Sequence, residues 1–124
     1  MKEKNNESAE NYLETILVLS KRNNTVRSID IVNELGLSKP SVSVAMKNLR
    51  EGGYIIMDEN GHIALTGSGL KIADTIYERH TWLTSYLVDL GVNPKTAAED
   101  ACRIEHVISD ESFRAMQRQF DKTK

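Results

Sequence analysis

The segment Leu35-Gly36-Leu37-Ser38-Lys39-Pro40-Ser41-Val42-Ser43 decides the fold, because it predicts a tight turn between two helices. Gly36 permits the sharp turn, Ser38 can cap a helix, and Pro40 suits a first helical turn, where its missing N–H would have no partner. The second helix is predicted over about residues 39–51, and its inward stripe is Val42, Met46 and Leu49. This pattern is typical of a DNA-reading helix-turn-helix.

Two helices are predicted upstream of this turn. Residues 28–34 form a short helix capped by Ser28, with Ile29, Ile31 and Val32 facing inward. A longer helix runs from Ala9 to the Asn23-Asn24 pair. Its apolar positions, at helical spacing, are Tyr12, Leu13, Ile16, Leu17 and Leu19. Asn11 and Glu14 lie on its other side, three residues apart.

A β-hairpin is predicted directly after the second helix of the motif. Gly52-Gly53 stops that helix, residues 54–57 read as a strand, 58–61 as a turn and 62–65 as a returning strand. A hairpin in this place is a wing. His62 beside the turn is interpreted as a surface residue, with a phosphate contact as the alternative.

Basic residues outnumber acidic ones around the motif, which predicts a local DNA-binding surface. The basic residues are Lys21, Arg22, Arg27, Lys39, Lys47 and Arg50, and the acidic ones are Asp30 and Glu34. Small hydroxyl residues at the start of a helix allow close approach to a phosphate or a base edge. The predicted DNA contacts are Arg27, Ser38, Lys39, Pro40, Ser41, Ser43 and Lys47. The alternative is an ordinary helical hairpin with solvated charges.

The second half of the chain is predicted to be helical. Thr66 caps a helix of about residues 67–90, whose apolar stripe is Ile72, Ala73, Ile76, Leu83, Leu87 and Leu90. His80 falls on that stripe, so it is either a core histidine bonded to a carboxylate or carbonyl, or a metal ligand. Trp82 and Tyr86 are expected to pack on a neighbouring helix. A last helix is capped at 109–111, and its Phe113, Met116 and Phe120 suggest a dimer surface or support for one.

The helix between these two carries the segment Asp100-Ala101-Cys102-Arg103-Ile104-Glu105-His106. Helical spacing would place Cys102, Glu105 and His106 on one face. Thiolate, carboxylate and imidazole are the side-chain groups that bind first-row transition metals. The segment therefore indicates a metal site, and the alternative is a polar face beside a small thiol.

Composition limits the other classes of function. The chain has 124 residues, 40% of them hydrophobic and 27% charged, with a net charge of -2 and one cysteine. No apolar run approaches a membrane span, and no secretory signal opens the chain, so we expect a cytoplasmic protein without membrane association. One cysteine excludes an intramolecular disulfide framework. The small negative charge argues against a globally basic nucleic-acid binder and leaves room for a local basic surface.

The order of elements resembles the diphtheria toxin repressor family of metal-dependent transcriptional regulators over about residues 9–121. The most specific match is the run Glu99 to Glu111, which looks like the iron-responsive branch. Weaker matches are Asn11-Tyr12-Leu13-Glu14, residues 37–43, Leu65-Thr66-Gly67-Ser68-Gly69 and Arg79-His80. The resemblance implies a mainly α fold, with a winged helix-turn-helix at residues 1–66 and a helical metal-binding and dimerisation domain at 67–124.

The resemblance also implies a ligand set. It comprises Asn11, Glu14, His80, Cys102, Glu105 and His106. Asn11 occupies a position where the iron branch has methionine and the manganese branch has aspartate. Glu14 matches the manganese branch. Cys102 matches the iron branch. Thr84 and Ala98 occupy positions where iron-responsive members carry further ligands, so the resemblance does not support a second, ancillary site of that kind. The alternative is a recombined site that includes Glu14. Val44 replaces a polar base-contacting residue of the reading helix, so operator preference is expected to differ.

The expected function is a homodimeric repressor that binds double-stranded operator DNA when a divalent metal bridges the two domains. A thiolate with imidazole and carboxylate favours Fe(II), with Mn(II) second and Zn(II) or Co(II) as in-vitro ligands. The alternative is a metal-independent winged-helix regulator that senses an oxidant or small molecule through Cys102. We expect no enzymatic activity, because Cys102 and His106 have no orienting third group and no oxyanion device.

Overall fold

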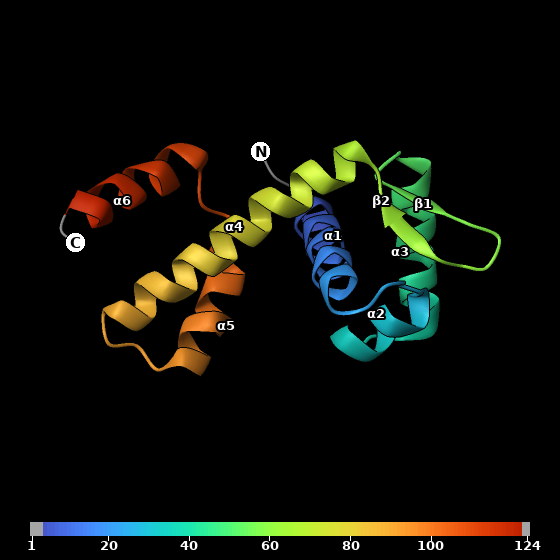
Figure 1. The fold of residues 1–124 in the computed structure, drawn as a ribbon, viewed down its shortest axis with the longest axis horizontal. Helices are drawn as coiled ribbons and strands as arrows, with labels where there is room; N and C mark the ends of the chain where they lie inside the picture. Colours follow the sequence, from blue (N-terminus) through green and yellow to red (C-terminus); the bar gives the residue numbers. More distant parts are fainter. Residues whose placement is uncertain (1–3, 123–124) are drawn as a thin grey trace. The chain divides into compact units, whose positions relative to one another are not determined.

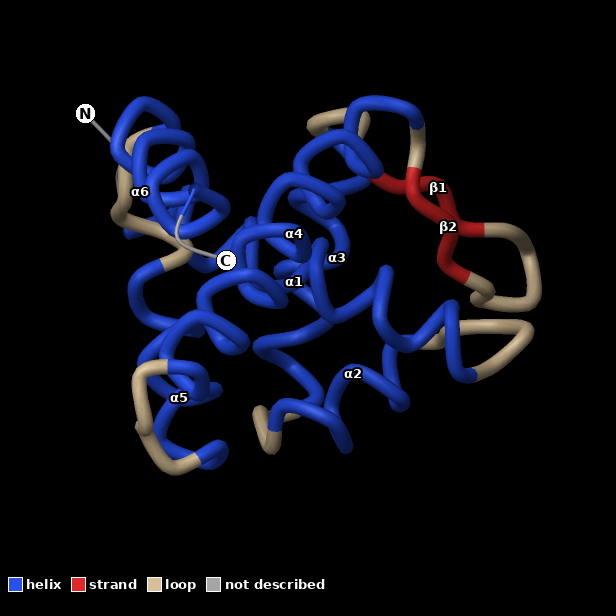
Figure 2. Tube along the Cα trace, turned by 60° about the vertical axis from the view of Figure 1, so that its left-hand side comes forward, coloured by secondary structure: helices blue, strands red, loops and turns tan. Residues whose placement is uncertain are grey.

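The computed structural model describes the backbone of residues 4–122 and the side chains of residues 7–121. Eight elements follow one another along this part of the chain (Figures 1 and 2). They are α1 (Lys4–Arg22), α2 (Ser28–Leu35), α3 (Lys39–Glu51), β1 (Ile55–Met57), β2 (Ile63–Leu65), α4 (Gly67–Asp89), α5 (Pro94–Ile104) and α6 (Asp110–Lys122). The mainly α class and the predicted order of elements are confirmed.

The first compact unit, Met1–Thr75, contains the helix-turn-helix and the wing. Its core is built from apolar residues of α1, α2, α3 and the hairpin. The members are Leu13, Ile16, Leu17, Leu19, Val26, Ile31, Val42, Met46, Leu49, Ile55 and Ile63. Gly36 follows α2 with φ 67°, a left-handed conformation that favours glycine, so the predicted tight turn is confirmed.

The wing is a two-stranded antiparallel hairpin, as predicted, with Ile56 opposite Ala64. It is joined to the helices by the N–H of Ile63, which donates to the carbonyl oxygen of Val26 at 2.7 Å. At its other end, the Thr66 hydroxyl donates to the Gly53 carbonyl at 2.7 Å and accepts from the N–H of Gly69 at 3.2 Å. Thr66 therefore caps α4, as predicted, and ties the start of that helix to the wing.

Three details of the first unit differ from the prediction. α1 begins at Lys4 rather than Ala9, because polar residues can continue a helix without contributing to its apolar stripe. The residue capping α2 is Arg27 rather than Ser28, and its N–H donates to the Asp30 carboxylate at 2.9 Å. Ile29 is 42% exposed instead of facing inward.

The second compact unit, Ile76–Lys124, packs the rest of α4 against α5 and α6. Leu83, Ala101 and Phe113, one from each helix, form its buried centre. Trp82 stacks on Tyr86 with ring centroids 4.9 Å apart and meets Phe120 edge-on at 5.7 Å. The expectation that Trp82 and Tyr86 pack on a neighbouring helix is confirmed.

α6 is held against α4 by charge as well as by aromatic rings. The Arg114 guanidinium donates to the Glu78 carboxylate at 2.9 and 3.2 Å, and this bond lowers the pKa of Glu78. Phe113 is fully buried within the unit, so it cannot itself be an exposed dimer surface, and the expectation that this helix forms or supports one stays a prediction. The two units divide inside α4, while the functional boundary at residue 66 stays a prediction.

Candidate metal centre and DNA-binding face

The metal-ligand segment begins in α5 and continues past the end of that helix. Asn93 caps α5 by accepting from the N–H of Lys95 at 2.9 Å, and the helix ends at Ile104. Glu105 is its C-terminal cap and His106 lies in the following turn. Glu105 keeps helical backbone angles, and its N–H donates to the Ala101 carbonyl at 2.9 Å. The expected helix face therefore holds for Cys102 and Glu105, while His106 lies in the turn beyond it.

The three side chains nevertheless converge. Their potential ligand atoms all lie within 4.8 Å of one another. Two ligands on one transition metal, each about 2.0–2.3 Å from the ion, lie at most about 4.6 Å apart, so small side-chain movements would suffice. Glu105 is fully buried, His106 is 6% exposed, and Cys102 is exposed. The cluster is anchored in the protein at Glu105 and His106 and opens to solvent at the thiol.

His80 joins this cluster from α4. Its Nδ1 lies 2.7 Å from Oε1 of Glu105. An ionised carboxylate only accepts, so with Glu105 ionised Nδ1 carries the proton and the lone pair is on Nε2. A carboxylate that fixes the tautomer in this way is a common companion of metal-binding histidines. The same bond also fits a satisfied core histidine, so both interpretations of His80 have geometric support.

Glu105 provides the test of whether these residues fit a metal. Its Oε2 is buried and accepts no hydrogen bond from the described part of the protein, while Nε2 of His106 lies 3.4 Å away. A buried carboxylate oxygen without a donor is costly. A cation at this point would remove that cost, and the thiolate, carboxylate and imidazole are suitable donors. The residues therefore fit a divalent transition metal.

The remaining predicted ligands belong to the first unit. Asn11 and Glu14 lie on α1, where the Asn11 carbonyl accepts from the Thr15 hydroxyl at 2.8 Å. In the second unit, the Thr84 hydroxyl donates to the His80 carbonyl at 2.7 Å, and Ala98 has no ligand atom. Neither Thr84 nor Ala98 replaces a carboxylate or an imidazole.

Most of the predicted DNA contacts lie at the start of α3, while Lys47 lies further along this helix and Arg27 precedes α2. Ser38 caps the helix, accepting from the N–H of Ser41 at 3.2 Å, and Pro40 lies in the first turn. The predicted residues are all exposed. They are Arg27, Ser38, Lys39, Pro40, Ser41, Ser43 and Lys47. Beside them, Ser28, Val44, Arg50 and Met57 help to line a surface hollow between α2, α3 and β1.

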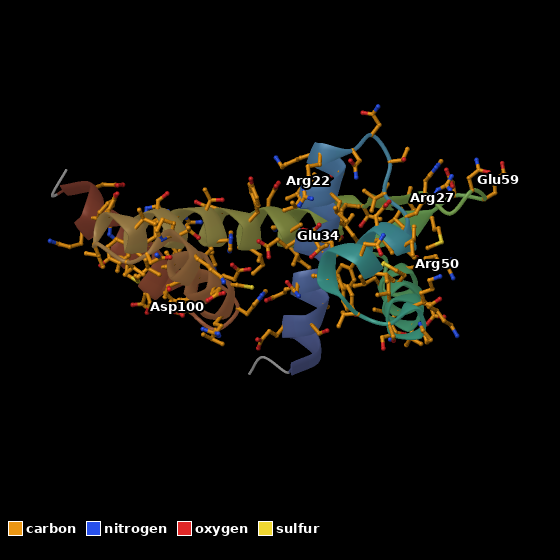
Figure 3. The ribbon with its side chains drawn as sticks, turned by 90° about the horizontal axis from the view of Figure 1, so that it is seen from below. Arg22, Arg27, Glu34, Arg50, Glu59 and Asp100 are labelled. Carbon is orange, nitrogen blue, oxygen red and sulfur yellow. The ribbon has the colours of Figure 1, made fainter. Side chains whose placement is uncertain are left out.

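Not every basic residue near the motif contributes to this surface. Arg22 and Glu34 point toward one another from α1 and α2 (Figure 3), and both guanidinium nitrogens donate to the carboxylate, at 3.2 and 3.0 Å. This pairing neutralises Arg22. Arg27 instead reaches the wing, where its Nη2 lies 3.1 Å from Nε2 of His62. His62 also contacts Asp58, so it belongs to a surface network.

Arg79 is part of the family match Arg79-His80, but the sequence assigns it no role, and it is only 9% exposed. Its guanidinium donates to the backbone carbonyls of Glu105 and Ile108, inside the turn that carries the ligands. The sequence does indicate that Arg79 is buried. It lies three residues after Ile76 and four before Leu83, on the apolar stripe of α4.

Comparison with known proteins accounts for both halves of this arrangement. Residues 5–63 match the model of the N-terminal DNA-binding domain of iron-dependent repressors. Residues 66–124 match that of the iron-dependent repressor metal-binding and dimerisation domain. The chain belongs to the iron-dependent repressor family. The resemblance to the diphtheria toxin repressor family is thereby confirmed, and membership favours metal-dependent repression over oxidant sensing through Cys102.

Several relatives show how far the family likeness extends. The transcriptional regulator MntR of Escherichia coli O157:H7 is 35% identical over 109 residues, covering 88% of this chain and 70% of that protein. A helix-turn-helix-type transcriptional regulator of Methanocaldococcus jannaschii is 32% identical over 120 residues, covering 95% of this chain and 96% of that protein.

Solved structures of the family show the same fold. The manganese regulator SloR superposes with a TM-score of 0.80 at 25% identity, covering 91% of this chain and 53% of that one. A manganese-dependent repressor in complex with manganese gives 0.78 at 28% identity, with coverage of 92% and 51%. This chain thus spans about half the length of those two structures. None of the helices within residues 4–122 is both long and apolar enough to cross a membrane.

Proposed function

We propose that this chain is a homodimeric repressor that grips operator DNA in the cytoplasm when a divalent metal joins its two units. The observation that carries the proposal is the convergence of Cys102, Glu105 and His106 within 4.8 Å, in a domain of the metal-binding and dimerisation type. The buried Oε2 of Glu105, which lacks a donor among the described residues, supports it because a cation would satisfy that oxygen.

The proposed ligand set is completed by His80 from α4 and by Asn11 and Glu14 from α1. The support for His80 is its contact with Glu105, and the support for the α1 residues is the family resemblance. α1 belongs to the DNA-binding unit, so a bound cation would supply a cross-link between that unit and the dimerising one. Metal then favours the DNA-binding form only by its differential affinity for that form.

The metal we infer is Fe(II), with Mn(II) as the second candidate. The Cys102 thiolate supports Fe(II), since soft sulfur ligands suit it better than they suit Mn(II). Glu14 and the relatives named as manganese regulators support Mn(II). Zn(II) and Co(II) suit the same donors and are expected to bind in vitro.

The DNA contacts are proposed to come from the start of α3 and from Arg27. The exposed hydroxyls of Ser41 and Ser43 and the ammonium groups of Lys39 and Lys47 support this assignment. In a dimer, two reading helices meet half-sites about 34 Å apart, so their separation determines whether both can engage.

The test begins by selecting duplexes from a randomised DNA library with the anaerobic Fe(II)-loaded and Mn(II)-loaded protein. Binding to a selected duplex is then measured by fluorescence anisotropy with each metal and with a chelator. We expect metal to tighten binding by about 5–150-fold, a typical coupling between two sites. Fe(II) should act at a lower free concentration than Mn(II).

Variants separate the proposal from its rival. Glu105→Gln should abolish the metal response, whereas Arg103→Gln, on the exposed surface of the same helix, should keep it. Equal DNA affinity with metal and with chelator would refute the switch. A Cys102→Ser protein that keeps the metal response and loses sensitivity to peroxide would favour the oxidant-sensing regulator.

A further inference from the structure

Arg79 connects α4 to the turn that carries two of the candidate metal ligands. Its Nη1 donates to the carbonyl oxygen of Glu105 at 3.2 Å and to that of Ile108 at 3.0 Å. Both carbonyls lie between the end of α5 and the start of α6, where the chain crosses α4 (Figure 1). One guanidinium thus bonds both ends of a four-residue stretch that contains Glu105 and His106.

This stretch needs an external donor. The last carbonyls of a helix have no partner within it, and α5 ends at Ile104 without a glycine to reverse the chain. A cationic donor makes a stronger bond to a carbonyl than a neutral one does. Within the turn, the N–H groups of Val107 and Ile108 both donate to the Ile104 carbonyl at 3.0 Å. Arg79 adds a donor for the carbonyls of Glu105 and Ile108.

The hydrogen bonds of Arg79 are directed at this backbone rather than at an acidic side chain. Arg79 is 9% exposed, Asp110 is 3.8 Å from its Nη2, and its buried Nε has no acceptor among the described residues. Its guanidinium also lies 5.8 Å from the centre of the Phe113 ring. A buried ion pair is weak evidence for a role in stability, because replacing the whole pair by apolar side chains of similar volume is often neutral or stabilising. An apolar side chain could not donate the hydrogen bonds that Arg79 makes to the two carbonyls.

The adjacent residue of α4 acts on the same glutamate. His80 bonds the Glu105 carboxylate at 2.7 Å, while Arg79 bonds the Glu105 backbone. α4 thus restrains Glu105 at both ends, which limits where its carboxylate can point.

We propose that Arg79 is a positioning residue of the metal centre: by bonding the Glu105 and Ile108 carbonyls, it holds Glu105 and His106 in register with Cys102. This inference rests on the proposed function, because it assumes that these three residues bind the metal. It assigns to Arg79 no contact with the ion or with DNA.

The experiment uses Co(II) as the probe, because its visible spectrum reports both ligand geometry and bonding to a thiolate. Arg79→Met, Arg79→Lys and the surface control Arg103→Met are titrated with Co(II), and their folding is followed by circular dichroism and thermal unfolding. We expect Arg79→Met to remain helical while its Co(II) affinity falls about 10–100-fold, the range seen when residues supporting metal ligands are lost. Its d–d bands should shift, and Arg103→Met should match the wild type.

Arg79→Lys keeps a cationic donor but replaces the planar guanidinium by an ammonium group. We therefore expect its Co(II) affinity to lie between those of the wild type and Arg79→Met. A folded Arg79→Met with wild-type affinity and spectrum would overturn the inference. If Arg79→Met does not fold, wild-type Co(II) binding by Arg79→Lys would overturn it equally. Failure of the proposed function looks different, since Glu105→Gln would then bind Co(II) as tightly as the wild type.

Discussion

Gly69 lies where the first turn of α4 meets the start of the wing, and its missing side chain is required there. A Cβ at Gly69 would overlap the backbone carbonyl oxygen of Tyr54, which already accepts from the N–H of Thr66 at 3.0 Å. The obstacle is backbone, so it cannot rotate away.

We predict that Gly69→Ala destabilises the protein by about 1–3 kcal/mol, as overpacking of a tight site does. Gly67→Ala is the matched control, because its Cβ would meet nothing within 4 Å. It should be neutral or stabilising by up to about 1 kcal/mol, since alanine is the better helix former. Urea unfolding of both variants measures the difference. Equal stability would show that the contact at Gly69 relaxes freely.

Single residues also show where sequence reasoning stopped. Cys102, Glu105 and His106 were identified by their chemistry, and they do converge. The helical spacing holds as far as Glu105, but His106 lies in the following turn, and no glycine or proline marks that end of α5. Arg79 carries a signal, its place on the apolar stripe, but only the fold shows which carbonyls it reaches. Residue type thus indicates a metal site, while the groups that support it depend on tertiary contacts.

At the scale of elements, the wing turn is organised by one carboxylate. Oδ1 of Asp58 accepts from the N–H groups of Asn60 at 2.8 Å and His62 at 2.9 Å, and its Oδ2 lies 3.1 Å from Nδ1 of His62. These bonds, led by the one from the His62 backbone, lower the pKa of Asp58 below its ordinary value of 3.8. The ionised form is therefore the one that the folded turn favours.

A lowered carboxyl pKa gives stability that is present above the pKa of the unfolded chain and is lost as the pH falls through the folded pKa. We predict that the amide resonances of Asn60 and His62 titrate with a midpoint below 3.8. NMR between about pH 2 and 6 measures this, and Asp58→Asn should abolish it. Glu59→Gln, at the tip of the same turn (Figure 3), should leave it unchanged. A midpoint at or above 3.8 would contradict the assignment.

Most elements were predictable because local signals mark their ends. Gly36 and Ser38 bracket the turn of the motif, Gly52-Gly53 ends α3, and Thr66 begins α4. The errors lie where such signals are weak or where tertiary packing decides. Ile29 is predicted to face inward yet is exposed, and Phe113 suggests a dimer surface or its support yet is buried with Leu83 and Ala101. Periodicity shows that a face is apolar, but it does not name the partner that covers it.

For the whole molecule, the net charge is negative, and a negative net charge alone would repel DNA. The chain carries a net charge of -2, while α3 presents Lys39 and Lys47 and has no acidic residue in its first turn. Attraction to DNA then depends on where the cations lie and not on their sum. Each phosphate that a cation neutralises contributes about 0.9 to the slope of log affinity against log salt concentration.

We therefore predict that Lys47→Gln lowers that slope by about 0.9 for each protomer bound, because it removes a phosphate contact. Lys95→Gln, at the start of α5, changes the net charge equally and should leave the slope unchanged. Anisotropy titrations of the metal-loaded protein on one selected duplex, from about 50 to 200 mM salt, measure both. Metal affinity should be the same in the two variants, since neither lysine is a ligand. Equal loss of slope in both would mean that overall charge, rather than the α3 face, governs DNA binding.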